Sequence, residues 1–261
     1  ASTLRPRSLQ ILQKVLTGDN GIDRRHFAIA DIEKLFDRDA TALNQAFEEH
    51  APELATLVLG EAMEQAGLRA RDLDALFICT CTGYLCPGLS SYVAERIGLT
   101  PDAYIHDTVG LGCGAAIPTL RAVHHLIASQ PSARVAMVAV EICSAAFYLD
   151  DDPGVLISLC LFGDGASASI WNGHPGPTAL RATGFDTLHL PEYRELLRFE
   201  NQHGKLRNKL HRSVPDKAAL AVSRLYEKTQ EAPPTRVLAH AGGRDVLDAL
   251  SNSLPGHTLA E

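Results

Sequence analysis

Residues 107–125 read DTVGLGCGAAIPTLRAVHH, in which glycines flank one cysteine and an apolar helical pattern follows at once. Gly110, Gly112 and Gly114 surround Cys113. Glycine allows tight turns and positive φ, and it lets other groups approach the backbone closely. A cysteine buried only for packing needs none of this, so the stretch predicts a sharp elbow that presents a thiol.

The thiol at this elbow has two interpretations. As a nucleophile, Cys113 would gain from the helix N-terminus, which favours a thiolate and offers backbone N–H groups to a developing oxyanion. As a packing residue, it would be a small buried hydrophobe, which is the common role of a free cysteine. The glycines and the following helix favour the nucleophile.

A nucleophilic cysteine normally needs a histidine that keeps it ionised. His240 differs from most of the eleven histidines because it ends an apolar strand pattern and directly precedes Ala241-Gly242-Gly243. A hydrogen-bonded core histidine is the alternative interpretation. The sequence thus makes Cys113 and His240 the candidate catalytic pair.

Strand and helix patterns alternate along the rest of the chain. The predicted helices cover residues 8–16, 51–66, 88–99 and 114–129, and the predicted strands cover residues 74–82, 105–111 and 133–142. Residues 159–171, LCLFGDGASASIW, are expected to form a strand, a tight Gly-Asp-Gly turn and a second strand. This alternation is typical of an α/β architecture.

An internal repeat indicates a duplicated fold. Residues 51–97 and 215–254 both run helix, polar loop, strand, glycine, helix. The repeat puts Cys81 and His240 at equivalent strand ends, where open α/β sheets usually build their sites. Residues 174–185 interrupt the sheet pattern with prolines and glycines, so we expect one half over residues 1–174 and another over residues 175–261.

Composition excludes several classes of protein. The 261 residues carry a net charge of −7, which makes a broad nucleic-acid surface unfavourable. No apolar stretch reaches the roughly 18–20 residues that a membrane span needs, and the first residues lack a signal-peptide pattern. We therefore expect a cytoplasmic protein that binds neither membrane nor nucleic acid. The first residue is not Met, so residues are expected upstream.

The six cysteines suggest reduced thiols. Cys79, Cys81 and Cys86 are spaced as C-x-C-x4-C, whereas a structural zinc site would need paired C-x2–4-C motifs, and a disulfide scaffold would be denser in cysteine. No metal site is therefore expected.

Four motifs resemble one family when taken in order. GCGAAIPTLRAV (112–123), VEICSAAF (140–147), LFGDGASASI (161–170) and HAGGRDVLDAL (240–250) are similar to motifs of the thiolase superfamily, and most of all to its type III polyketide synthases, the chalcone and stilbene synthase family. The resemblance covers nearly the whole chain. It implies a thiolase-like α/β fold, with duplicated βαβ halves in a layered α-β-α-β-α arrangement.

The resemblance also implies roles for single residues. Cys113 would carry the starter and the growing chain as thioesters, and His240 would pair with its thiolate and donate to the thioester carbonyl oxygen. Phe162 would be a gate between the coenzyme A tunnel and the cavity, with core packing as its alternative. Cys81 and Cys143 would line the cavity.

Further positions follow from the same resemblance. Cys86 would reach across a dimer interface, and Gly242 of the H-x-GG motif would bind substrate. Asn208 falls where the family has a second gatekeeping phenylalanine, and Gly114 falls where plant members have a bulky residue, so the cavity is expected to differ. The family's catalytic asparagine, in a G-N-x-x-S motif, would lie beyond Glu261.

The implied reaction is iterative decarboxylative condensation of malonyl-CoA onto an acyl-CoA starter by a homodimer, without a bound metal or organic cofactor. Lys14, Arg24 and Arg25 are candidates for the phosphates of coenzyme A, unless they are only solvated surface. Two alternatives remain: a ketoacyl-acyl-carrier-protein synthase III, which condenses once, and a catalytically inactive subunit of the same fold.

Overall fold

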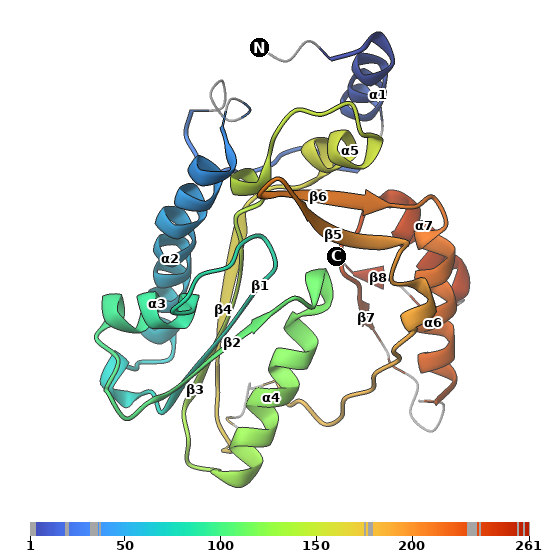
Figure 1. Ribbon diagram of the computed structural model, residues 1–261. Coiled ribbons are helices and arrows are strands. Elements are labelled where there is room, and N and C mark those ends of the chain that lie inside the picture. Colours follow the sequence, from blue (N-terminus) through green and yellow to red (C-terminus); the bar gives the residue numbers. More distant parts are fainter. Residues whose placement is uncertain are drawn as a thin grey trace.

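A four-stranded sheet forms the centre of the computed structural model, which describes residues 4–18, 21–31, 36, 38–174, 176, 180–228, 234, 236–254, 256–257 and 259–260 (Figure 1). Its strands lie in the order β2-β1-β3-β4. They are β1 (Ala75–Thr80), β2 (Tyr104–Val109), β3 (Val135–Glu141) and β4 (Gly165–Trp171). β1 pairs in parallel with β2 and β3, and β4 is antiparallel to β3. The predicted α/β class is confirmed.

The helices are α1 (Pro6–Thr17), α2 (Ala40–Gln65), α3 (Leu89–Ile97), α4 (Ala116–Ser129), α5 (Pro153–Leu161), α6 (Val214–Lys228) and α7 (Arg244–Ser253). Short 3₁₀ turns are η1 (Ala70–Asp72), η2 (Gly112–Gly114), η3 (Cys143–Ala146) and η4 (Pro191–Tyr193). None of the described helices combines the length and the apolar composition that a membrane span needs.

Helices cover both faces of the sheet. α2 and α3 lie on one face and α4 on the other (Figure 1). Leu76 of β1 packs in a core with Leu59 of α2, whereas the next residue, Phe77, packs in a second core with Val123 of α4. Every residue of β1 is buried. A strand covered on both faces has an unbroken apolar sequence, which is why this one could be predicted.

The predicted elbow is confirmed. β2 ends at Val109, η2 contains Cys113, and α4 begins at Ala116. Gly110 and Gly112 have φ angles of 82° and 57°. A side chain at either position would be strained, so these two glycines let the chain turn between the strand and the helix.

The longest helix extends further than the sequence predicts. α2 begins at Ala40 rather than at residue 51, because the side chain of Asp39 caps it by accepting a hydrogen bond from the Ala42 N–H at 2.8 Å. Pro52 lies inside this helix. Proline is usually confined to the first turn of a helix, and here it is tolerated in the interior.

The prediction of two strands over residues 159–171 is wrong in its first half. Residues up to Leu161 belong to α5, and only Gly165–Trp171 form a strand. Asp152 starts α5 by accepting hydrogen bonds from the backbone N–H groups of Gly154 and Val155. Because α5 is buried around most of its circumference, its sequence lacks the polar stripe that distinguishes a helix from a buried strand.

A hairpin that the sequence did not predict packs on α5. β5 (Leu197–Gln202) and β6 (Lys205–Leu210) are antiparallel and are joined by His203 and Gly204, both of which have positive φ. Two central residues with positive φ are typical of a type I′ turn, which usually carries Asn-Gly or Asp-Gly. Because His203 stands where Asn or Asp is usual, the sequence did not indicate a hairpin here. Figure 1 shows the hairpin lying across the region between α5 and α6.

The C-terminal elements follow the predicted order. α6, β7 (Val237–Leu238) and α7 correspond to the predicted helix, strand and helix, and β7 pairs in parallel with β8 (Leu259–Ala260). The apolar strand pattern was expected to end at His240, but β7 ends at Leu238, so the strand is shorter than expected and His240 lies just beyond its end. Pro175, at the predicted boundary between the halves, lies outside the described residues, and the division into two halves stays a prediction.

Gly154 is where the hairpin approaches α5 most closely. A Cβ at Gly154 would clash with the backbone oxygen of Asn208 in β6. We expect Gly154→Ala to lower the free energy of unfolding by about 1–3 kcal/mol, measured by urea titration, because a well-packed contact would have to open. Gly60 of α2 has no atom within 4 Å of such a Cβ, so Gly60→Ala is the matched control and should stabilise by roughly 0.5–1 kcal/mol. If the two variants changed the free energy of unfolding equally, the close contact between Gly154 and the hairpin would be contradicted.

Candidate active site

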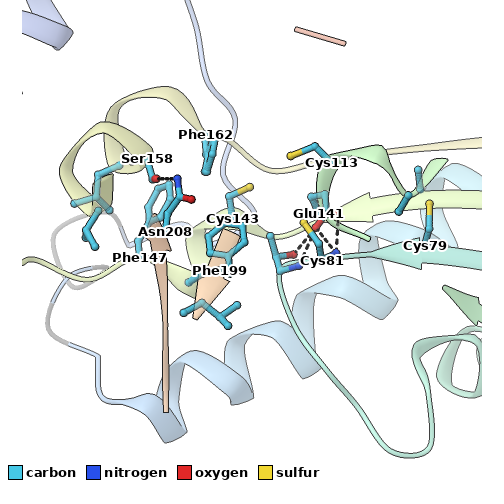
Figure 2. A pocket seen from close by; sticks show the side chains of 18 of the residues that line it. Cys79, Cys81, Cys113, Glu141, Cys143, Phe147, Ser158, Phe162, Phe199 and Asn208 are labelled. Carbon is cyan, nitrogen blue, oxygen red and sulfur yellow. Dashed lines mark hydrogen bonds between the residues drawn. The ribbon is translucent and has the colours of Figure 1, made fainter. Parts of the chain in front are cut away.

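A cavity of about 190 Å³ opens beside the elbow. Its walls come from the carboxyl ends of β1 and β3, from the η2 turn, from α5 and from the hairpin (Figure 2). The lining residues that bear on its chemistry are Cys81, Cys113, Glu141, Cys143, Phe147, Ser158, Phe162, Phe199, Asn208 and His240. Segments far apart in the sequence therefore meet at one pocket.

Most of the predicted site residues line this cavity. They are Cys113, His240, Phe162, Cys81, Cys143 and Asn208. Cys86 and Gly242 lie outside the cavity lining. Cys86 is exposed in the loop between β1 and α3, and Gly242 donates its N–H to the carbonyl of His240 at 2.8 Å. The roles of all eight residues stay predictions.

Two side chains favour the thiolate of Cys113. Its pKa is well below the usual range of a thiol, first because Cys81 donates a hydrogen bond to the sulfur and second because His240 does so. Burial acts in the opposite direction but is outweighed. The same contact with Cys113 raises the pKa of His240. The pair therefore tends toward a thiolate and an imidazolium at neutral pH.

Cys81 stays protonated beside this thiolate. Its pKa is raised, first by the hydrogen bond to Cys113, then by burial and by the negative charge of Glu141. Two thiols with pKa values shifted in opposite directions divide their roles, as pairs of titratable groups in active sites commonly do. Cys81 is placed as a hydrogen-bond donor to the sulfur of Cys113, and the role of Cys113 as a nucleophile stays a prediction.

Glu141 holds the turn that carries Cys81. Its carboxylate accepts hydrogen bonds from the backbone N–H of Cys81 at 2.9 Å and from the N–H and hydroxyl of Thr82 at 3.0 and 2.8 Å. Burial raises the pKa of Glu141, and these hydrogen bonds partly offset the effect. Figure 2 shows the carboxylate next to Cys81, at the end of β3. A buried carboxylate thus fixes the position of the Cys81 thiol.

Phe162 lies at the C-terminal end of α5, where Arg25 supports it. The guanidinium of Arg25 donates to the carbonyl oxygens of Leu159 and Phe162 and lies over the ring of Phe27. Arg25 is thereby occupied with protein groups, whereas Lys14 and Arg24 are exposed. Whether any of the three binds coenzyme A stays a prediction.

Asp164 connects the cavity wall to the rest of the fold. Its carboxylate accepts hydrogen bonds from the backbone N–H groups of Ala28 and Ser144, at 2.7 and 2.8 Å. Ser144 directly follows Cys143, whose thiol has a raised pKa because it is buried. The aspartate of the Gly-Asp-Gly motif thus anchors the η3 turn and with it Cys143.

The sequence did not identify Glu141 or Ser158 as site residues. Glu141 had a readable signal, because a carboxylate at the end of the apolar strand β3 must face the carboxyl edge of the sheet. Ser158 had none, because it lies within the segment α5 that only packing places beside the cavity. Among the described residues, no three His, Cys, Asp or Glu side chains are arranged to hold a metal ion.

Removal of the Cys81 thiol should raise the pKa of Cys113. The pKa of Cys113 is lowered to about 4, so we expect Cys81→Ala to move the midpoint of its pH profile for labelling by iodoacetamide upward by about one unit or more, because the thiolate loses a hydrogen-bond donor. Labelling of each cysteine can be followed by peptide mass spectrometry across a pH series. Cys143→Ala is the control, since that thiol also lines the cavity but stays protonated. The same pH profile in wild type and Cys81→Ala would rule out the donor role.

Comparison with known proteins gives one consistent family. A family model described as FAE1/Type III polyketide synthase-like protein matches residues 1–178. The 3,5-dihydroxyphenylacetyl-CoA synthase of Streptomyces toyocaensis is 27% identical, over 89% of this chain and 64% of the relative. The 1,3,6,8-tetrahydroxynaphthalene synthase of Streptomyces coelicolor is 28% identical, over 81% of this chain and 58% of the relative. The chain thus spans less than two thirds of these relatives' length.

Solved structures agree with the fold. The crystal structure of 1,3,6,8-tetrahydroxynaphthalene synthase from Streptomyces coelicolor, a bacterial type III polyketide synthase, matches with a TM-score of 0.84 at 24% identity, over 95% of this chain and 71% of that one. Germicidin synthase from the same species, also a type III polyketide synthase, matches with a TM-score of 0.74 at 27% identity, over 82% and 58% of the two chains.

Proposed function

Because this chain belongs to the family of FAE1/type III polyketide synthase-like proteins, we propose that it carries the nucleophilic site of a type III polyketide synthase. The reaction is the iterative decarboxylative condensation of malonyl-CoA onto an acyl-CoA starter. The observation that carries the proposal is the Cys113–His240 pair, in which the pKa of the thiol is lowered and that of the imidazole is raised beside one cavity.

The first step is loading of the starter. The Cys113 thiolate attacks the carbonyl carbon of the acyl-CoA thioester, and the oxygen takes up the negative charge as a tetrahedral intermediate forms. Collapse of this intermediate breaks the bond to the coenzyme A sulfur, which leaves and takes a proton from solvent. The new thioester bond joins the acyl group to Cys113.

The second step is extension. Malonyl-CoA loses its terminal carboxylate as carbon dioxide, and the electron pair of the broken bond forms the enolate of the acetyl thioester. The imidazolium of His240 donates a hydrogen bond to the thioester oxygen as charge develops there. The enolate carbon attacks the thioester on Cys113, whose sulfur leaves as a thiolate. The extended chain is then transferred back to Cys113 for the next cycle.

No bound metal or organic cofactor takes part in the proposed reaction. Loss of carbon dioxide drives carbon–carbon bond formation, and the thioesters supply the activated acyl groups. Coenzyme A esters are the substrates. A ketoacyl-acyl-carrier-protein synthase III is not favoured, because the family model and the named relatives belong to type III polyketide synthases.

We also propose that the enzyme works as a homodimer in the cytoplasm. Support for the dimer comes from β2, the edge strand of the four-stranded sheet, where Tyr104, Ile105 and Val109 expose large apolar side chains. An uncovered apolar edge strand tends to pair with another chain. Sedimentation of the full-length protein at micromolar concentration should give a dimer. A monomer would contradict this part of the proposal.

The proposed activity can be tested with defined substrates. The full-length protein is incubated with malonyl-CoA and a panel of acyl-CoA starters, and products are identified by mass spectrometry. We expect products heavier than the starter by whole numbers of acetate units, with one carbon dioxide released per unit. A single condensation with every starter, or a requirement for an acyl carrier protein, would contradict the proposal.

A further inference from the structure

Asn208 presents a buried hydrogen-bond acceptor that no group of the described residues satisfies. The residue is 3% exposed and lines the cavity from β6. Its side-chain oxygen Oδ1 is buried and has no hydrogen-bond partner within the part of the chain that the structure describes. An unpaired buried acceptor costs free energy unless something meets it, so native proteins rarely keep one without a purpose.

The contact with Ser158 fixes which way the amide of Asn208 points. The hydroxyl of Ser158 donates its single proton to the carbonyl of Gly154 at 2.7 Å. Ser158 Oγ can therefore only accept from Asn208, at 2.7 Å, and the group that faces it must be the Nδ2 amide. The amide oxygen is then directed away from Ser158. Figure 2 shows it on the side of Asn208 that faces Cys143 and Phe162.

Several apolar side chains line the same cavity. Phe147, Phe199 and Leu206 line the cavity near the hairpin and offer no hydrogen-bond donor. The thiol of Cys143 is a weak donor. On the hairpin side of the cavity a ligand therefore meets an amide acceptor beside apolar side chains, whereas Glu141 and His240 line the cavity near Cys113. A few placed polar groups on an apolar wall are the usual composition of a site that selects its ligand.

We propose that Asn208 Oδ1 accepts a hydrogen bond from a hydroxyl of the acyl chain carried on Cys113, so that the site selects hydroxylated acyl groups. This inference rests on the proposed function. The hydroxyl has two possible sources: an alcohol or phenol on the starter, or the enol form of a β-keto group in the growing chain. Ser158 acts as a positioning residue, because it holds the amide with its oxygen toward the chain.

The selection has a physical cause. A chain that carries the hydroxyl satisfies Oδ1, whereas a chain without it leaves the acceptor unpaired. The cost of one unpaired buried group corresponds to a discrimination of about 10-fold or more in loading efficiency. If the cavity selected acyl chains by their length or volume alone, it would not distinguish a hydroxylated chain from a plain chain of the same length.

The experiment compares matched pairs of starters on the full-length protein. Loading is measured as coenzyme A released per enzyme with 4-hydroxycinnamoyl-CoA against cinnamoyl-CoA, and with 6-hydroxyhexanoyl-CoA against hexanoyl-CoA. A separate arm supplies malonyl-CoA and records the lengths of the products. Asn208→Leu removes the acceptor at similar size. Asn172→Leu is the matched control, because it makes the same change at an exposed asparagine that lies outside the cavity lining.

If the hydroxyl belongs to the starter, wild type should load one hydroxylated member about 10-fold more efficiently than its partner, and Asn208→Leu should bring this ratio close to one. If the hydroxyl belongs to the enol, the ratio of loading between the two starters of a pair should be the same in wild type and Asn208→Leu. The products made by Asn208→Leu with malonyl-CoA should then be shorter than those of wild type or differ in their distribution of lengths. Asn172→Leu should preserve both the starter ratios and the product lengths of wild type. Asn208→Ala repeats the test if Asn208→Leu does not fold.

Two results would contradict the account in different ways. If Cys113 is loaded but starter ratios and product lengths are the same in wild type and both Asn208 variants, the inference is overturned and the proposed function stands. If no acyl-CoA loads the enzyme, the proposed function fails and the inference fails with it.

Discussion

Cys113→Ala should abolish polyketide formation by the full-length protein while malonyl-CoA still loses carbon dioxide. The thiol holds the acyl chain that the enolate attacks, but it takes no part in breaking the bond to the carboxylate. We expect product to fall by at least about 10³-fold, a loss typical of removing a nucleophile. Carbon dioxide release from malonyl-CoA should remain measurable by a coupled or radiometric assay.

Cys160→Ala is the matched control for this experiment. Cys160 is buried in α5 and lies outside the cavity lining, so its removal should leave condensation intact. Continued chain extension by Cys113→Ala would show that the elbow and its glycines serve packing. Loss of decarboxylation together with condensation would show that the two half-reactions do not divide between Cys113 and His240 as proposed.

His240→Ala should lose both half-reactions. Without the imidazole, the thioester oxygen lacks a donor as the enolate forms, and decarboxylation should slow by about 10²–10³-fold. The same change removes the ion-pair partner of Cys113, so its pKa should rise and its alkylation at pH 6.5 should slow. His211→Ala is the control, because His211 is exposed and lies outside the cavity lining.

The direction of the pH dependence follows from the two pKa shifts. The thiolate–imidazolium pair exists above the lowered pKa of Cys113 and below the raised pKa of His240. Loading should therefore fall on the acid side as Cys113 gains a proton, and on the alkaline side as His240 loses one. In His240→Ala the acid limb should move to higher pH. An unchanged acid limb would mean that His240 does not act on the thiol.

The sequence predicts best where one local pattern determines the structure. The elbow at Cys113 needed only its glycines and the change from strand to helix period. The buried strand β1 was readable because both of its faces are covered. The family resemblance, which depended on four motifs in order, is confirmed by the family model.

The sequence predicts the structure less well where tertiary packing determines it. α5 resembled a strand because it is buried on most sides, and the His-Gly turn gave no recognisable hairpin signal. Asn208 was expected to alter the cavity, but its contact with Ser158 joins residues 50 positions apart. The hydrogen bond from Cys81 to Cys113 likewise joins the end of β1 to the η2 turn, which meet only in the folded protein. Such contacts set the chemistry of the cavity, and no local pattern encodes them.

The identity of the acylated residue tests the central claim most directly. The full-length protein is mixed with an acyl-CoA starter in the absence of malonyl-CoA, quenched in acid, digested and mapped by peptide mass spectrometry. We predict one acyl group, on the peptide that contains Cys113, with loading favoured at a pH where an ordinary thiol would be protonated. Acylation of Cys81 or Cys143 instead, or turnover without any acyl-enzyme, would contradict the assignment of Cys113 as the nucleophile.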